Sequence, residues 1–396
     1  MSELRALPNV TKAEDMRVPL KSWAVEAEAG AIEQASNLAR LPFALHHVAL
    51  MPDAHPGYGM PIGGVFFADK AVVPYAVGVD IGCGVMLIET EAVVEDLIPD
   101  MVGWIMDAIA RDVPVGNGPQ AQHKTPQGEP FERPDAPEHT RQILSAAEVQ
   151  LGTLGGGNHF LELQADPGGR IWAMLHSGSR SVGKKLCDHH HRIAADACKR
   201  WHVVLPDPEL AFLPWETDEA QAYWRDMTIA LEWAEENRRR MGAKVIGAIG
   251  EVTGSKAWQV LDVHHNYAAL ENHFGHNGIV HRKGAVRARA GEQVLIPGSM
   301  GTASYVAEGL GNPDSFQSCQ HGAGRARSRA ATRKTVSLAD MEAQMAKAGV
   351  LLVTPDPSKV TDESAFAYKD IEVVMAASAE LVKPVTRLIP LGVVKG

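Results

Sequence analysis

The stretch AVGVDIGCGV, residues 76–85, places a carboxylate and a thiol three positions apart among three glycines. The two groups are Asp80 and Cys83, and the other residues around them are small or β-branched and apolar. A buried charge has to be paired or bound to a metal, whereas a buried cysteine alone packs as a small hydrophobic residue. Asp80 is therefore the stronger indication that this stretch does chemistry.

Histidines occur at several glycine-rich turns of this chain, which contains 17 of them. The sequences are LGGGNHFLEL with His159, MLHSGSR with His176, LDVHHNY with His264 and His265, and CQHGAGR with His321. A single histidine is more often structural than a ligand, but strand ends that lead into glycine loops commonly hold reactive groups. By contrast, CDHHHRIA, which begins at Cys187, is typical of a helix surface, and we expect no chemistry there.

Five of these residues form a candidate metal-ligand set: Asp80, Cys83, His159, His176 and His265. One carboxylate, one thiolate and three imidazoles are more than a single tetrahedral ion needs. A two-metal site in which both ions share the thiolate would use them all, and pairs of ions about 3.5–4 Å apart recur in phosphoryl transfer. Ligand softness alone favours Zn²⁺.

Basic residues cluster beside the histidines, although the net charge of -10 excludes a general polybasic coat. HGAGRARSR contains Arg325, Arg327 and Arg329, HRKGAVRAR contains Arg282, Lys283, Arg287 and Arg289, and Arg180 follows His176. Such runs are usually solvated, but arginines beside glycine loops suit the phosphates of a nucleotide or a nucleic acid. PGSMGTASY, with Ser299 and Ser304 on either side of Gly301, predicts a second anion or nucleoside site.

Composition sets the broad class of the protein. The 396 residues are 45% hydrophobic, which is enough for a large core, and the length would allow two or three domains. Apolar runs stay well short of the roughly 18 residues of a membrane span, and the first residues show no apolar signal region. The four cysteines lack paired spacing, which fits a reducing compartment, so we expect a cytoplasmic protein.

The expected elements are unevenly distributed. Residues 42–90 alternate short apolar runs with Gly and Pro, which predicts strands and structured loops. The polar, Pro- and Gly-rich stretch 112–139 predicts a mobile surface loop or lid, with plain disorder as the alternative. Residues 218–241 have helical spacing, with Arg238–Arg240 near the expected end, and a second helix is expected from Ser337 to Gly349.

The motifs resemble those of the RtcB RNA-splicing ligases, in the same order along the chain. They are MPDAHPGYGMPIGG, VGVDIGCGV, GTLGGGNHFLEL, HSGSR, HHNY, HRKGA, PGSMGTASY, HGAGR and the terminal VVKG. The resemblance extends from about residue 45 to the last glycine. It implies a mixed α/β (α+β) fold with one large RtcB-like domain over residues 1–396 and a deep metal-lined cleft.

The resemblance also implies an activity, namely a GTP- and Mn²⁺-dependent ligase. Such an enzyme joins RNA ending in a 2′,3′-cyclic phosphate or 3′-phosphate to RNA beginning with a 5′-hydroxyl, through a covalent histidine–GMP intermediate. The metal ligands would be the five residues above, with Cys83 bridging two Mn²⁺ ions, and the nucleophile would be His321. The family's preference for manganese takes precedence over the softness argument, because availability and geometry often decide metal identity.

Further residues receive roles only through the resemblance. Guanylate-binding positions would be Asn158, Glu162, Ser299, Ser304, His321, Gly322, Ala323, Gly324 and Lys395. RNA phosphates would be bound by Arg180, Lys283, Arg325 and Arg329, and Asp53 matches a position near the site without an assigned role. His321 has no carboxylate neighbour in the sequence that suggests a structural ion pair.

Two stretches depart from the family pattern: the 112–139 loop and residues 200–241, which we expect to be a helical insertion. The motifs do not separate tRNA splicing from RNA repair, and they leave open a helper protein for turnover and the oligomeric state. Two other classes of protein remain open. A metal-dependent phosphohydrolase would use the same ligands without GTP or a nucleophilic His321, and a catalytically silent RNA-binding protein would need only the arginines.

Overall fold

The structure is a computed structural model that describes residues 7–98 and 100–396. Strands and helices are mixed along the chain, so the predicted α/β class is confirmed. The α-helices are α1 (Ala29–Ala39), α2 (Pro74–Val77), α3 (Met101–Asp112), α4 (Glu138–Ala147), α5 (Ser181–Arg200), α6 (Asp218–Thr253), α7 (Arg329–Thr335), α8 (Leu338–Ala348) and α9 (Ile371–Ala377). Short 3₁₀ turns are η1 (Val94–Asp96), η2 (Pro119–Ala121), η3 (Glu148–Gln150), η4 (Pro208–Leu210), η5 (Pro313–Ser315), η6 (Pro357–Glu363) and η7 (Ala365–Ala367).

Two large sheets carry the candidate site. The six-stranded sheet has the order β1 (Asn9–Thr11), β2 (Leu20–Ser22), β3 (Ala44–His55), β4 (Ile62–Ala68), β12 (His276–Lys283) and β11 (Asn266–His273). The eight-stranded sheet has the order β10 (Ala257–His264), β6 (Gly84–Val93), β8 (Arg170–Ser177), β7 (Phe160–Ala165), β18 (Val382–Val394), β15 (Ser304–Gly309) and β14 (Gln293–Ile296), with β17 (Leu351–Val353) beside β18. Two small ribbons pair β13 (Ala285–Arg287) with β16 (Ser318–Gln320) and β5 (Ala71–Val72) with β9 (Leu213–Pro214).

The predicted strand-rich region at residues 42–90 is confirmed, because β3, β4, β5 and β6 all lie within it or start in it. Helix α8 also begins and ends where the sequence predicts. The Ser337 hydroxyl accepts a hydrogen bond from the Asp340 amide, the Asp340 carboxylate accepts one from the Ser337 amide, and Gly349 closes the helix in a left-handed conformation.

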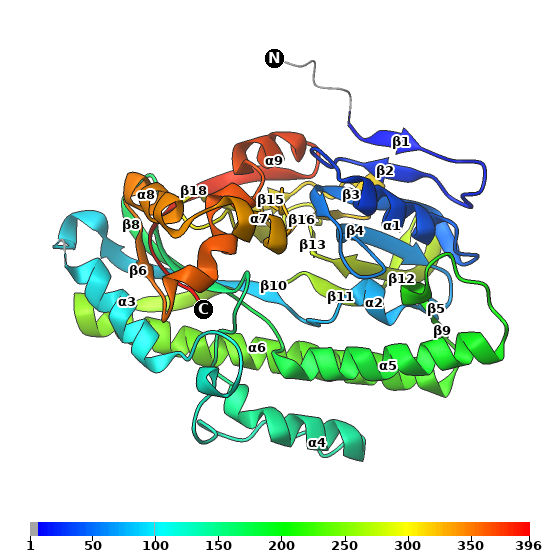
Figure 1. The fold of residues 1–396 in the computed structure, drawn as a ribbon, viewed down its shortest axis with the longest axis horizontal. Coiled ribbons are helices and arrows are strands. Elements are labelled where there is room, and N and C mark those ends of the chain that lie inside the picture. The colour runs from blue at the N-terminus through cyan, green and yellow to red at the C-terminus, as the bar shows by residue number, and fades with distance from the viewer. Residues whose placement is uncertain (1–6, 99) are drawn as a thin grey trace.

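Helix α6 is the long support beneath both sheets (Figure 1). It has 36 residues, begins after a Thr217 cap whose hydroxyl accepts from the Ala220 amide, and ends at Gly254. Its first half buries Tyr223 and Trp233 in the same cluster as α5, whereas its second half buries Met241 and Val245 with the apolar residues of β6, β7 and β8. One continuous helix thus connects the two halves of the core.

The expected end of this helix near residue 241 was wrong, because α6 continues to Thr253. Arg238–Arg240 therefore lie in the middle of the helix rather than at its C-terminal dipole. Arg238 is buried, since its Nε donates to Asp262 at 2.7 Å, while Arg239 and Arg240 bond Glu236 on the solvent side. Three consecutive helical residues point to different faces of the helix, and Arg238 is the one that points into the core.

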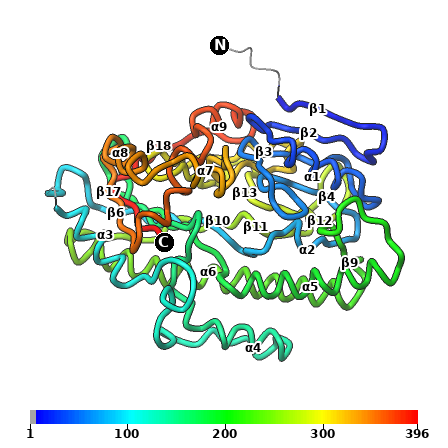
Figure 2. Tube along the Cα trace, viewed as in Figure 1, coloured from blue at the N-terminus to red at the C-terminus, as the bar shows by residue number. Residues whose placement is uncertain are grey.

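The segment 112–139 runs along the outside of α6 before α4, as the chain path in Figure 2 shows. It contains the short η2 turn and is otherwise irregular. His123 lies 3.3 Å from the Gly152 carbonyl, and Arg240 donates to the carbonyls of Gln127 and Glu129. The segment is therefore packed on the helix along part of its length, and its mobility stays a prediction.

The sequence CDHHHRIA lies in α5, as expected for a helix, but not wholly on its surface. His190 is only 1% exposed, which corrects that expectation for this residue. Its neighbours on the helix are more accessible. Within residues 7–98 and 100–396, the helices are all too short or too polar to cross a membrane.

Asn237, one residue before Arg238, fastens two segments to α6, one at Gly152 and Thr153 and one at Ser177 and Gly178. Its side chain is fully buried and makes five hydrogen bonds. Its Oδ1 accepts from the amides of Gly152 and Thr153 at 2.8 and 3.2 Å, and its Nδ2 donates to Thr153, Ser177 and Gly178. Removing this amide would leave buried backbone groups without partners, which costs about 1–3 kcal/mol for each group.

We expect Asn237→Ala to lower the free energy of unfolding by about 3 kcal/mol or more, measured by urea denaturation of the metal-free protein. Gln221→Ala is the matched control, because this exposed amide on the same helix makes a single bond to the Trp215 carbonyl. The control should change stability by less than about 0.5 kcal/mol. Equal losses in the two variants would show that Asn237 is not a structural anchor.

Candidate active site and metal centre

The candidate metal ligands lie where the ends of four neighbouring strands of the eight-stranded sheet meet. Cys83 directly precedes β6, His159 directly precedes β7, His176 is near the end of β8, and His265 directly follows β10. These four strands are adjacent and antiparallel, so the start of one lies beside the end of the next. The sheet thus brings together residues that are up to 182 positions apart, from Cys83 to His265.

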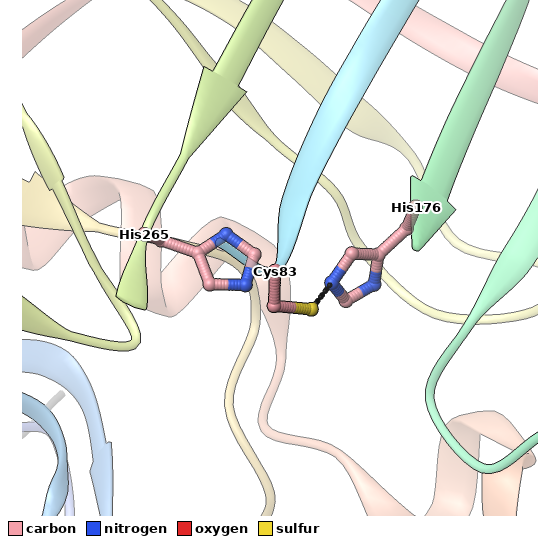
Figure 3. A group of neighbouring side chains, drawn as sticks. All are labelled: Cys83, His176 and His265. Carbon is pink, nitrogen blue, oxygen red and sulfur yellow. Dashed lines mark hydrogen bonds between the residues drawn. The ribbon is translucent and has the colours of Figure 1, made fainter. Parts of the chain in front are cut away.

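His265 marks the passage from one sheet to the other, because β10 belongs to the eight-stranded sheet and β11 to the six-stranded sheet. Figure 3 shows Cys83 between His176 and His265, with the sulfur directed toward His176. Two groups of three candidate ligands have their donor atoms within 4.8 Å of one another. They are Cys83, His176 and His265, and Asp80, Cys83 and His159, so Cys83 belongs to both.

The imidazoles are oriented by backbone carbonyls behind them. His159 Nδ1 lies 3.0 Å from the Leu154 carbonyl, and His176 Nδ1 lies 3.2 Å from the Asn158 carbonyl. A proton on each Nδ1 leaves Nε2 free, and these Nε2 atoms lie 3.4 and 3.2 Å from Cys83 Sγ. Such carbonyl partners are the usual support of metal-bound histidines.

The electrostatics of this cluster fit a bound cation. Burial lowers the pKa of His176 and of His265 well below the usual value, so both imidazoles are neutral, as ligands must be. Burial raises the pKa of the Cys83 thiol well above its usual value, and the nearby Asp80 charge adds to this effect. A bound divalent cation would offset the negative charge of the thiolate and so favour the ionised form of Cys83. His265 Nδ1 is buried without a hydrogen-bond partner among the described residues.

Asp80 is held in its ionised form. Burial alone would raise its pKa, but the hydrogen bond and charge of His159, 3.2 Å away, lower it to about 2. Its Oδ1 accepts from the Ser179 amide at 3.0 Å and from the Ser179 hydroxyl at 3.1 Å. Gly178 has to be glycine here, because a Cβ would lie 2.3 Å from Asp80 Oδ2. The carboxylate is thus positioned before any ion arrives.

His321 follows β16 directly and lies beside this cluster. Its ring centroid is 4.7 Å from that of His265, and its Nδ1 is 2.6 Å from Asp53 Oδ2 at the end of β3. The expectation that no carboxylate pairs with His321 was wrong. Asp53 forms this pair, and the sequence did not indicate it because Asp53 is 268 positions away. The fully buried carboxylate favours a proton on Nδ1 and therefore an unprotonated Nε2.

A cleft of about 360 Å³ opens above His321. Its walls include the predicted guanylate positions Asn158, Glu162, Ser299, His321, Gly322, Ala323, Gly324 and Lys395, together with His176, Arg325 and Arg329. Ser304 lies behind the wall, where its hydroxyl accepts from Gln164 at 3.1 Å and from the Gly298 amide at 3.2 Å. Burial raises the pKa of Glu162 to about 7.

A buried ion-pair network closes one side of the cleft around Glu363. Its carboxylate lies 3.3 Å from Lys395 Nζ and 3.3 Å from Arg325 Nη1, and it also pairs with Arg329 and the Tyr368 hydroxyl. Burial lowers the pKa of Lys395, in opposition to the charge of Glu363. Arg325 and Arg329 therefore already have carboxylate partners, and Arg329 keeps 40% of its side chain exposed.

The other two predicted phosphate contacts are more enclosed. Arg180 donates through Nε to the Thr153 hydroxyl at 3.3 Å, and burial lowers its pKa. Lys283 donates to the carbonyls of Tyr58 and Tyr75 at 2.6 and 3.2 Å, and burial lowers its pKa to about 8. The structure thus brings Arg325 and Arg329 to the cleft wall but surrounds Arg180 and Lys283 with protein groups.

Comparison with known proteins identifies the family of this chain. The family model described as tRNA-splicing ligase RtcB matches residues 34–133 and 120–396. The chain is a member of the RtcB family. It is 37% identical to the RNA-splicing ligase RtcB of Escherichia coli over 402 residues, which cover 96% of this chain and 97% of the relative.

More distant RtcB proteins match over similar lengths. The RNA-splicing ligase RtcB of Mycobacterium tuberculosis is 33% identical, with 92% of this chain and 100% of the relative covered. The tRNA-splicing ligase RtcB of Pyrobaculum aerophilum is 32% identical, with 92% and 91% covered. The resemblance inferred from the motifs is therefore confirmed for nearly the whole chain.

Several residues of the site in this RtcB protein escaped the sequence analysis. Ser179 and Asn266 stand inside the recognised motifs HSGSR and HHNY, where their position beside ligands could have indicated them. Asn266 Nδ2 donates to the Asp80 carbonyl at 3.0 Å. Glu363 and Tyr368 carry no local signal, because their role depends on contacts with distant basic residues.

The geometry predicts that adjacent histidines at the end of β10 differ in metal binding. We expect His265→Ala to weaken Mn²⁺ binding by the metal-stripped protein by roughly 100-fold or more, because it removes a donor atom. Cys83→Ala should weaken binding further, since Cys83 belongs to both ligand groups. Isothermal titration with Mn²⁺ measures both effects.

His264→Ala is the matched control for this experiment, because the exposed His264 packs against Tyr267 outside the ligand groups. Its Mn²⁺ isotherm should equal that of the unaltered protein. If His264→Ala and His265→Ala weaken binding equally, the assignment of His265 as a ligand is wrong.

Proposed function

We propose that this protein is an RNA ligase that joins a 2′,3′-cyclic-phosphate or 3′-phosphate end to a 5′-hydroxyl end, with GTP as the energy source. The observation that carries the proposal is the position of His321 between the metal-ligand cluster and the cleft, with Asp53 at its Nδ1. Support also comes from the relatives, whose names are RNA-splicing or tRNA-splicing ligase. The substrate is RNA from either splicing or repair.

In this proposal the metal is Mn²⁺, with two ions held by Asp80, Cys83, His159, His176 and His265. When bound, the ions would offset the negative charge that develops on phosphate oxygens. The overlap of the two ligand groups at Cys83 supports a thiolate shared by both ions. The protein's contribution is to keep the imidazoles of His176 and His265 neutral and the Asp80 carboxylate ionised before binding.

His321 is the proposed nucleophile. With the Asp53 carboxylate 2.6 Å from its Nδ1, its Nε2 lone pair attacks the α-phosphorus of GTP, so that a P–N bond forms as the bond to pyrophosphate breaks. The imidazole becomes positively charged in this step, and the buried Asp53 carboxylate stabilises that charge. GMP then passes from His321 to the RNA 3′-phosphate, and the 5′-hydroxyl displaces it to form the phosphodiester. A cyclic phosphate is first opened by water to a 3′-phosphate.

The cleft supplies groups that suit a guanine nucleotide. Glu162 is a carboxylate whose pKa is raised by burial, although it accepts a hydrogen bond from Gln164 Nε2 at 2.8 Å. The edge of guanine presents two adjacent N–H donors, whereas the corresponding edge of adenine has an acceptor ring nitrogen. Asn158, Ser299, Ser304 and Lys395 complete the proposed guanylate site with the backbone of residues 322–324.

Arg325 and Arg329 are proposed to bind RNA phosphates at the rim of the cleft. A guanidinium has five N–H donors, so the pairs with Asp362 and Glu363 leave donors for a phosphate. The carboxylates hold both side chains in place in the absence of RNA. Arg180 and Lys283 stay predicted phosphate contacts, although protein groups now surround them.

A metal-dependent phosphohydrolase is the second candidate, because it would use the same ligand cluster. It would activate water at the metals and would need neither GTP nor a nucleophilic histidine. The two candidates therefore differ in one observable, which is the fate of the α-phosphate of GTP. Only the ligase retains it on the protein.

We expect His321→Ala to form no protein–GMP adduct when incubated with Mn²⁺ and GTP labelled at the α-phosphate, measured on a denaturing gel. The unaltered protein should retain the label in a bond that is labile in acid and stable in base, as a phosphoramidate is. Mn²⁺ binding should be unchanged in the variant, because the five ligands are separate residues.

A substrate that is already activated provides the internal control for this variant. RNA with GMP preattached to its 3′-phosphate needs only attack by the 5′-hydroxyl, so His321→Ala should still join it to a second strand. Adduct formation by His321→Ala would show that another residue is the nucleophile. Absence of label on the unaltered protein, together with release of phosphate from RNA, would favour the phosphohydrolase.

A further inference from the structure

A second histidine cluster lies where α4 meets α5 and α6, on the side of the helix layer where α4 projects in Figure 1. His139 is in the first turn of α4, His189 and His190 are consecutive residues of α5, and Asp226 is on α6. One ring nitrogen from each histidine lies within 4.8 Å of the others. None of the roles assigned to the cleft involves these residues.

The cluster is organised around the buried carboxylate of Asp226. Its Oδ1 accepts a hydrogen bond from the Thr140 hydroxyl at 2.9 Å. Its Oδ2 lies 2.7 Å from His190 Nε2 and 3.3 Å from His139 Nε2, so two helices direct an imidazole to one oxygen. The carboxylate is fully buried and the His190 side chain is 1% exposed, whereas 39% of the His139 side chain is accessible.

A hydrogen-bonded pair of Asp226 and His190 does not account for the whole cluster. The ring of His189 lies 4.6 Å from that of His139 and 4.9 Å from that of His190, so a third imidazole joins the two that contact the carboxylate. His190 Nδ1 is buried and has no partner among the described residues, although buried polar atoms are normally bonded. A cation among the rings would give their nitrogens a common partner.

We propose that His139, His189 and His190 bind a divalent transition-metal ion at a site separate from the catalytic cleft, with Asp226 orienting His190 through its Nε2. Three imidazoles are a donor set that Zn²⁺ and related ions prefer, with water as the fourth ligand. Ligand atoms around a tetrahedral zinc ion with bonds of about 2.0–2.2 Å are about 3.3 Å apart. Asp226 Oδ2 and His190 Nε2 are only 2.7 Å apart, which is a hydrogen-bond distance, so Asp226 orients His190 and leaves its Nδ1, which has no partner among the described residues, available for the ion.

The site would fasten α4 to the helices that support the catalytic residues. Helix α4 follows the largely irregular segment 113–137. The N-terminal end of this segment contacts Gly155, in the loop that precedes His159. There Val115 pairs with Gly155, and the Gly116 amide donates to the Gly155 carbonyl at 2.9 Å. A bound ion at the α4 end therefore fixes the distal end of a segment that borders the cleft at its other end.

Zinc content of the full chain tests this site independently of ligase activity. The protein is stripped with a chelator, reloaded with excess Zn²⁺, dialysed, and its metal content measured by mass spectrometry. We expect His189→Ala and His139→Ala each to hold one equivalent less than the unaltered protein. His189 and His139 are on different helices and partly exposed, so both variants should fold, which circular dichroism checks.

His191→Ala is the matched control, because this next residue of α5 stacks on Tyr75 at 3.7 Å instead of joining the cluster. Its zinc content should equal that of the unaltered protein. Loading with Co²⁺ reports on the catalytic site separately. The thiolate absorption of Co²⁺ bound to Cys83 should persist in His139→Ala, His189→Ala and His191→Ala. Hydrogen exchange in residues 138–147 should slow on Zn²⁺ binding in the unaltered protein but not in His189→Ala.

Two results would overturn the proposal. One is equal zinc content in His189→Ala, His139→Ala and the unaltered protein. The other is a zinc loss in His191→Ala as large as that in His189→Ala, which would indicate general damage to α5 rather than loss of a ligand.

Discussion

The site depends on one buried cation, the guanidinium of Arg238 in the middle of α6. Its Nε donates to Asp262 on β10 at 2.7 Å, and its Nη1 donates to the Gly82 carbonyl at 2.7 Å and the Ser177 carbonyl at 3.1 Å. These three partners lie beside His265, Cys83 and His176. Since an unpaired buried charge is very unfavourable, the Arg238 side chain fixes where each of these segments can lie.

This constraint explains how the long helix α6 supports the candidate metal centre. Asn237 and Arg238 reach four ligand-bearing segments from one turn of α6, while the rest of the helix packs apolar side chains against both sheets. Gly82 permits the approach, because a Cβ there would lie 2.9 Å from Ala234 Cβ. The strands determine which residues share an edge, and the helix determines how closely their ends converge.

The parts of the site that the sequence predicts are those encoded locally. Glycine-flanked candidate ligands and the capped helix after Ser337 are short-range patterns, and the structure places the former at strand ends and the latter at residues 338–348, as expected. Asp53 and His321 are 268 positions apart, and Glu363 and Lys395 lie in different segments of the C-terminal part, so both pairs follow from topology rather than from a local pattern. Periodicity also cannot show that the buried face of α6 continues past residue 241 or that it includes an arginine.

The central claim is that a nucleophilic His321 works beside a metal centre that shares Cys83. A crystal structure of the protein grown with Mn²⁺ and GTP tests it most directly, with anomalous scattering used to locate manganese. The account predicts continuous density from His321 Nε2 to the phosphorus of GMP, and two manganese peaks that both contact Cys83 Sγ. Phosphorus bonded to another residue, or manganese bound away from Cys83, would contradict it.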